Sequence, residues 1–238
     1  MALAKIFGID WAGIAKVGGI DAANLAKYKH VEVPAGGCSA PVFRSAGEAN
    51  STASGNSITI PKPSGTVEGD LLIASIYWND RNQDPTPPSG WTLLNFVPSG
   101  ATSSSIGAWF KVAGASEPSD YTWTSTGSVS RRAGTIACFS GSYDADPEDA
   151  AVVTTDGSAT SAGITTVSDC AMVVYLSGVD AAPGATWTEP SGWTSAGPDN
   201  GTASTYIGYY YPGTAGATGT ISYNTGQWNF VWAFKRND

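Results

Sequence analysis

The chain has 238 residues, of which 42% are apolar, 11% aromatic and only 13% charged, so it can bury the core of one β domain with an appendage. Twenty acidic against twelve basic residues give a formal net charge of −8, which excludes a sequence-independent attraction to nucleic acid or anionic lipid. No secretory leader and no run of about 18 apolar residues is present, so the sequence predicts no membrane insertion.

Residues 1–33 form a predicted N-terminal arm built from a short repeat. GIDWAGIAK at residues 8–16 returns as GIDAANLAK at residues 19–27, a period of 11 residues. Each copy suits either a two-turn helix or an extended strand, and neither is stable alone in water. We therefore expect the arm to dock on its own domain or on a partner, through its regularly spaced apolar side chains: Ile9, Trp11, Ile14, Ile20, Leu25 and Tyr28.

The remainder of the chain divides into a linker and a β domain. Residues 34–56 are rich in Gly, Ser and Ala and predict a linker with at most one edge strand, at Val42–Phe43. Residues 57–238 carry short runs of Val, Ile, Thr, Tyr and Trp between turn residues, the pattern of an all-β domain. Strands are expected near 57–61, 70–78, 91–97, 105–112, 120–125, 132–140, 150–155, 170–178, 204–211, 218–223 and 228–235.

The β region repeats itself in sequence. PSGWT occurs at residues 88–92 and again at residues 190–194, a spacing of 102. An apolar strand precedes each copy, and an aromatic strand, a Thr-rich strand and a closing apolar strand follow it. Two such similar Greek-key halves predict a two-sheet, jelly-roll-like sandwich.

Catalytic and metal-binding patterns are poorly represented. The sole histidine, His30, lies where the arm meets the linker, so a Ser-His-Asp or Cys-His site has no base within the β domain. Three cysteines at wide spacing match neither a disulfide framework nor a metal knuckle, which favours reduced thiols with Cys138 and Cys170 on core strands. The sequence predicts a protein that is not an enzyme and needs no cofactor.

Two acidic turns are weak candidates for calcium. Asp80, Asn82 and Asp84 alternate as in a calcium loop, but the sixth position lacks glycine and Trp91 stands where the glutamate ligand belongs. The second turn contains Asp144, Asp146, Glu148 and Asp149. Asp and Asn favour turns for backbone reasons, so solvated turns are the preferred interpretation and no metal site is predicted.

Aromatic residues are the remaining signal, with nine Trp and ten Tyr. Most of the tryptophans fall on predicted strands and are expected in the core. Trp78 and Trp187 adjoin polar loops, where an exposed indole could stack on a sugar ring. A subunit interface or a partly covered core tryptophan explains the same position equally well.

The quoted segments resemble parts of phage virion proteins. IAKVGGI at residues 14–20 is similar to the IAKVNGV-type N-terminal repeats of tailed-phage and prophage structural proteins. GDLLIA, PSGWTLL, AWFKVAGASEPSDYTW and AGTIACFSG resemble the β-sandwich segments of phage tail, fibre and head-surface accessory proteins.

The resemblance implies a non-enzymatic virion component, assembled in the host cytoplasm and released by lysis. It implies other virion proteins as partners and a homo-oligomeric state. Two roles follow. In the first, the arm anchors the chain and the β domain decorates or stabilises the head or tail. In the second, the chain is an adhesin that binds a receptor or a host-surface glycan through loops near Trp78 and Trp187.

Overall fold

The computed structural model describes residues 16–17, 20–21, 40–79, 85–97, 104–156, 160–179, 188–197, 204–222 and 228–237. The chain divides into two compact units, residues 1–37 and residues 38–238, which are described separately. In the first unit, β1 (Lys16–Val17) pairs antiparallel with β2 (Ile20–Asp21). The described part of the arm is therefore extended.

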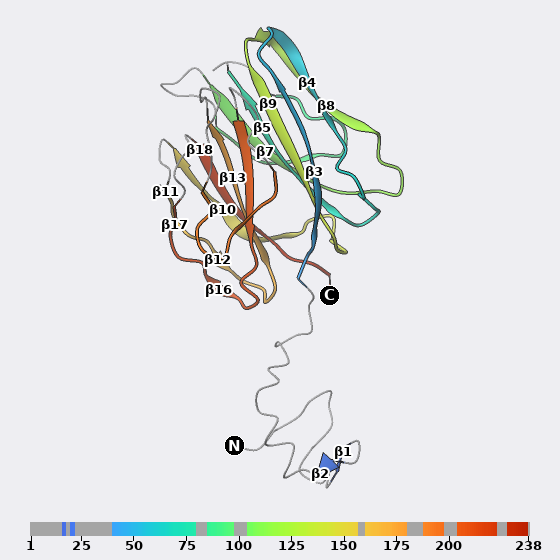
Figure 1. Ribbon diagram of the computed structural model, residues 1–238, viewed down its shortest axis with the longest axis vertical. Helices are drawn as coiled ribbons and strands as arrows, with labels where there is room; N and C mark the ends of the chain where they lie inside the picture. The colour runs from blue at the N-terminus through green and yellow to red at the C-terminus, as the bar shows by residue number, and fades with distance from the viewer. Residues whose placement is uncertain are drawn as a thin grey trace. The chain divides into compact units, whose positions relative to one another are not determined.

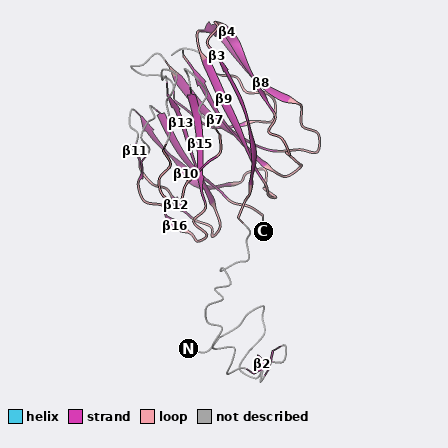
Figure 2. Ribbon diagram, in the orientation of Figure 1, coloured by secondary structure: helices cyan, strands magenta, loops and turns pink. Residues whose placement is uncertain are grey.

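Every regular element of the described residues is a strand, as Figure 2 shows, which confirms the all-β class predicted from the sequence. All eleven expected strands have a counterpart. The strands of the second unit are β3 (Phe43–Ser51), β4 (Gly55–Pro61), β5 (Leu71–Trp78), β6 (Thr92–Val97), β7 (Ser105–Val112), β8 (Asp120–Val129), β9 (Arg132–Phe139), β10 (Glu148–Asp156), β11 (Thr160–Ser161), β12 (Thr165–Thr166), β13 (Met172–Val179), β14 (Thr194–Ser195), β15 (Ser204–Tyr210), β16 (Gly216–Ala217), β17 (Ile221–Ser222) and β18 (Trp228–Phe234).

Strand pairing divides the second unit into two halves. In the first half, β3 to β9, a five-stranded antiparallel sheet has the order β3-β9-β5-β7-β6, and β4 pairs separately with β8. In the second half, β10 to β18, the five-stranded sheet has the order β10-β18-β13-β15-β14. In each sheet, the first strand of the half lies at one edge and the last strand of the half lies beside it. Three intervening strands complete the sheet, so the two sheets have the same strand order.

The two five-stranded sheets pack face to face. β15 lies across from β9 and β5, and β13 lies across from β5 and β7. Large apolar side chains of both sheets form the central core: Leu71, Ile73, Tyr77, Ile106, Phe110, Phe139, Met172, Val174, Leu176, Ile207, Trp228, Phe230, Trp232 and Phe234. This arrangement places β3, an edge strand of the first sheet, and β14, an edge strand of the second sheet, at the same edge of the sandwich.

Small sheets cover the outer face of each large sheet, which the predicted two-sheet sandwich did not include. β4 and β8 cover the first large sheet over a core that contains Ile60, Trp109 and Trp123. The two-residue pairs β11–β17 and β12–β16 cover the second large sheet, and their core includes Ile164 and Ile221. Figure 1 shows β4 and β8 on one side of this unit and the short strands on the other.

These outer layers explain the apolar central strands. Every residue of β5, β9, β13 and β18 is buried, so their side chains need cover on both faces. A strand in which apolar and polar residues alternate needs cover on one face only. The continuous, largely apolar run LLIASIYW of β5 requires a central position in a sheet that is covered on both faces.

The two halves share local irregularities as well as strand order. A bulge separates Phe43 from Ser45 on β3, and a bulge separates Glu148 from Ala150 on β10, so Arg44 and Asp149 occupy the extra positions. The turn before β5 contains Gly69 with φ 86°, and the turn before β13 contains Cys170 with φ 63°. Cys170 is the only non-glycine residue with positive φ among the described residues.

Candidate functional site

The structure corrects the expectation for Trp78. Its side chain is fully buried at the end of β5, opposite Arg132 of β9, in the core beneath β4 and β8. A sugar ring cannot stack on an indole that is enclosed on both faces. Trp78 is therefore a core residue, and the polar loop that follows it in the sequence gave a misleading indication of exposure.

The other predicted site residues fall mostly outside the described residues. Of the predicted docking residues only Ile20 is described, and it pairs with Val17 in the short β1–β2 sheet. The remaining predicted positions lie outside: Ile9, Trp11, Ile14, Leu25, Tyr28, Asp80, Asn82, Asp84 and Trp187.

The second acidic turn uses its carboxylates within the fold. Asp149 accepts hydrogen bonds from the backbone N–H groups of Val167 (2.8 Å) and Ser168 (3.0 Å), and Asp144 accepts one from the Asn237 side-chain amide (2.7 Å). Among the described residues no group of three or more His, Cys, Asp and Glu side chains converges as a metal site would require. These carboxylates act as turn caps.

The cysteines differ from the sequence-based expectation. Cys138 is a buried free thiol on β9, as expected, and burial raises the pKa of this thiol to about 12. Cys170 lies in the turn before β13 rather than on a core strand, and it is disulfide-bonded. Its partner sulfur lies outside the described residues. The expectation of a reduced Cys170 was wrong because wide sequence spacing says nothing about distance in the fold.

An aromatic pocket lies beside β6 on the first half. It encloses about 220 Å³, and its described lining residues are all apolar: Pro85, Pro87, Trp91, Leu93, Phe96 and Trp109. Leu93 is 52% exposed, whereas Trp91 and Trp109 are buried, so the pocket opens at Leu93 above two indoles. A lining of this kind suits apolar or ring-shaped groups.

The equivalent turn of the second half is less enclosed. Trp91 is 7% exposed and packs edge-on against Tyr121 and Trp123, at centroid distances of 5.2 and 5.1 Å. Trp193 is only half-buried and stacks on Tyr210 at 5.6 Å. The two indoles of the PSGWT repeats therefore occupy related but unequal environments.

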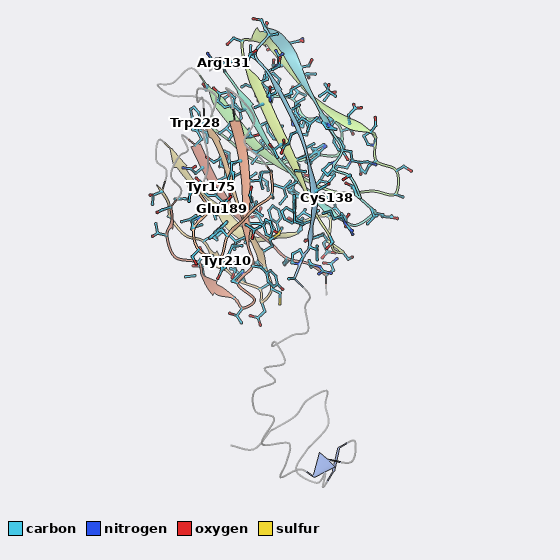
Figure 3. All side chains as sticks on the ribbon, viewed as in Figure 1. Arg131, Cys138, Tyr175, Glu189, Tyr210 and Trp228 are labelled. Carbon is cyan, nitrogen blue, oxygen red and sulfur yellow. The ribbon has the colours of Figure 1, made fainter. Side chains whose placement is uncertain are left out.

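A polar cluster underlies the Trp193 region of the second half. The Tyr206 hydroxyl donates to the Glu189 carboxylate at 3.2 Å, and the hydroxyls of Tyr175 and Ser177 both donate to the Asn229 side-chain oxygen. Figure 3 labels Tyr175 and Glu189, which come from this half of the unit. Burial raises the pKa of Tyr175 above its ordinary value, so this phenol stays neutral and serves as a donor.

An edge groove runs along β3, between the two halves. It encloses about 620 Å³ and is lined by Phe43, Ser45, Ala46, Gly47, Glu48, Pro61, Ser195 and Gly197. β3 supplies five of these residues, Pro61 ends β4, and Ser195 and Gly197 belong to β14 and the turn after it. Glu48 is the only charged side chain among the described lining residues, which therefore supply one negative position.

Glycines give the edge groove its shape. A Cβ atom on Gly47 would lie 1.8 Å from the Pro61 carbonyl oxygen, and one on Gly197 would lie 2.7 Å from Cγ2 of Thr135. Both distances are shorter than atoms tolerate, so only glycine fits at these close approaches. Sequence reasoning missed this groove because its walls come from three separate segments, rich in small residues. The one local signal was the Gly/Ser/Ala-rich composition interpreted as a linker.

A pH-dependent cluster fixes the turn between β7 and β8. The Glu117 carboxylate accepts hydrogen bonds from the Gly114 N–H (2.7 Å) and the Tyr121 hydroxyl (2.8 Å) and pairs with Lys111 (2.9 Å). Burial alone would raise the pKa of Glu117, but these donors outweigh it and hold the pKa below its ordinary value. Ionised Glu117 therefore stabilises the fold above its unfolded pKa, and that stability disappears as the pH falls through the lower folded pKa.

We expect Glu117→Gln to lower the free energy of unfolding at pH 7 and to match the natural chain more closely below about pH 4, where the unfolded carboxyl is protonated. Urea unfolding of both proteins at the two pH values measures this. An undiminished difference at the lower pH would contradict the assignment, because a purely steric defect does not titrate.

Within the described residues there is no helix that could cross a membrane. Comparisons of the chain with protein-family models, with curated proteins and with solved structures found no match.

Proposed function

We propose that this chain is a non-enzymatic structural component of a phage particle, anchored by residues 1–33 and decorating or stabilising the head or the tail. The observation that carries the proposal is the division of the chain into a small N-terminal unit and a large β unit. The apolar residues of the arm are too few for an independent core, so they need a docking surface. The virion-like repeats of the arm and the sandwich segments support a particle as that surface.

The proposed assembly takes place in the host cytoplasm, with other virion proteins and further copies of the chain as partners. Disulfides persist in oxidising surroundings, so we infer that the Cys170 disulfide forms after release by lysis. The aromatic pocket and the edge groove are binding surfaces rather than reaction sites, in keeping with a structural role.

We also infer that the two halves arose by duplication of one Greek-key unit, the basis of the predicted jelly-roll-like sandwich. The shared strand order, the paired bulges at Arg44 and Asp149, and the PSGWT spacing support this inference. Gly90 and Gly192 of the two PSGWT copies both have positive φ, 85° and 88°, so the two turns are built alike.

The alternative role is an adhesin that binds a receptor or a host glycan. The aromatic pocket at Trp91 favours it, because a pocket lined by aromatic and apolar side chains is suited to ring-shaped ligands. This pocket replaces Trp78 as the candidate ligand site. Copy number separates the two roles: many copies per particle favour decoration, and few copies favour a tail or fibre adhesin.

Deleting residues 1–33 is expected to abolish incorporation into particles while leaving a folded β unit, because no strand of that unit comes from the deleted segment. Co-sedimentation of the truncated protein with particles measures incorporation, and thermal melting is the control for folding. Normal incorporation of the truncated protein would show that the arm is not the anchor. Failure to fold would show that the arm belongs to the β core.

A further inference from the structure

We propose that the edge groove along β3 receives, as an added β-strand, one repeat of the N-terminal arm of a second copy of the chain. The inference deepens the proposed function, on which it rests, by naming the surface to which the arm docks. It follows from the open edge of β3, the shape of the groove walls and the charge of the two partners.

β3 is the edge strand of the first large sheet. It pairs with β9 on one side, and no described strand pairs with its other side. Backbone groups along such an edge form hydrogen bonds with an incoming extended segment, the mode called β-strand addition. β3 is nine residues long, so its edge is ample for a short peptide.

The walls of the groove fit a backbone rather than a folded domain. Pro61 borders β3 on one side and Ser195 with Gly197 on the other, so the open edge of β3 lies in a recess. Gly197 approaches Glu48 and Ala46 closely, since a Cβ atom there would lie 3.4 Å from Oε1 of Glu48. Residues 43–48 span about 20 Å as a strand, so about six extended residues fit beside them.

The arm matches this recess in size and conformation. Each 11-residue repeat is longer than the roughly six extended residues that fit beside residues 43–48. The described arm residues are extended, in β1 and β2, as strand addition requires.

The charges of the two partners are complementary. Residues 1–33 carry four lysines against three acidic residues, and the other residues carry 8 basic against 17 acidic side chains. Lys5, Lys16 and Lys27 recur with the 11-residue period, so every repeat brings a positive charge to the acidic β unit. The opposite charges favour encounter and fix the register of the added strand.

A second copy is the donor because the arm presents its motif in tandem. One arm offers the repeat twice, and a tandem repeat matches an array of identical grooves. Further copies of the chain supply such an array where they stand on a symmetric particle. The arm would then connect neighbouring β units.

Site-specific photo-crosslinking in the full chain tests the proposal. A benzophenone-bearing residue replaces Ser195 on the groove wall, and heavy-isotope and light-isotope chains are mixed before irradiation. We expect cross-links that join position 195 of one isotope to peptides within residues 1–33 of the other. The same probe at the exposed Thr124 of β8 is the control and is expected to give none of these cross-links.

A synthetic peptide of residues 8–28 is expected to suppress the cross-link, and a scrambled peptide of the same composition is expected not to. Cross-links only within one isotope, cross-links to β-unit residues alone, or no cross-link at all would overturn the proposal. These outcomes are independent of the co-sedimentation assay. If deletion of residues 1–33 abolishes incorporation but the cross-link does not form, the arm is an anchor to another virion protein. If the cross-link forms but the protein lacking residues 1–33 still incorporates normally, the anchor role is refuted and the strand addition stands.

Discussion

Trp123→Ala is expected to lower the free energy of unfolding by about 3–5 kcal/mol, the range for removing a large aromatic side chain from a core. Trp123 is fully buried on β8 and holds the outer layer of the first half on its sheet. Its ring lies 5.1 Å from that of Trp91 and 6.1 Å from that of Trp109, so truncation also removes two edge-on aromatic contacts.

Urea unfolding followed by tryptophan fluorescence and by circular dichroism measures the change. Thr124→Ala on the same strand is the matched control, because the Thr124 side chain is exposed and its replacement is expected to stay within about 0.5 kcal/mol. A loss below about 1 kcal/mol for Trp123→Ala would contradict a close-packed layer between β8 and the first sheet.

Asp70→Ala is expected to lower the free energy of unfolding by about 3 kcal/mol, because it removes a buried carboxylate and leaves its charged partner Arg44 unpaired. The Asp70 side chain is 1% exposed, pairs with Nε of Arg44 at 2.7 Å and accepts the Val67 N–H at 2.9 Å. Truncation leaves the Val67 N–H without its acceptor. Arg44 is one-third exposed and can be hydrated, which keeps the loss moderate.

The second half suggests a rescue of this variant. There the bulge residue is Asp149 rather than Arg44, and its carboxylate caps Val167 and Ser168 in the turn before β13. We expect the double variant Arg44→Asp, Asp70→Ala to be more stable than Asp70→Ala alone, because the carboxylate now comes from the bulge. A double variant less stable than the single variant in urea would show that the two bulges are not interchangeable.

The strands were predictable because apolar alternation and turn residues are local signals. The run LLIASIYW indicated a central strand, and β5 is buried throughout. The strand pairs β11–β17 and β12–β16 were not predictable as separate sheets, since two residues carry no period. β3 was underestimated, because small residues such as Ala46 and Gly47 form a strand here through pairing with β9 rather than through propensity.

The candidate sites were less predictable than the fold. Trp78 was misassigned because sequence proximity to a polar loop does not reveal the cover that β4 and β8 provide. The aromatic pocket joins Pro85 and Pro87 with indoles from two other segments, and only the tertiary fold brings them together. Arg44 and Asp149 carry opposite charges at equivalent bulge positions of the two halves. The strand pairing reveals this equivalence, and the sequence alone does not.

The strand pairing within each half has a consequence for synthesis on the ribosome. Hydrogen bonds of the large sheets join strands of one half only, so the first half has all its partners once Phe139 has emerged. The strand β18, which completes the opposing sheet, ends at Phe234. At typical elongation rates the interval lasts roughly 5–20 s, during which the apolar inner face of the first sheet is uncovered. The nascent chain therefore passes through a stage at which an apolar sheet face is exposed and prone to association with other chains.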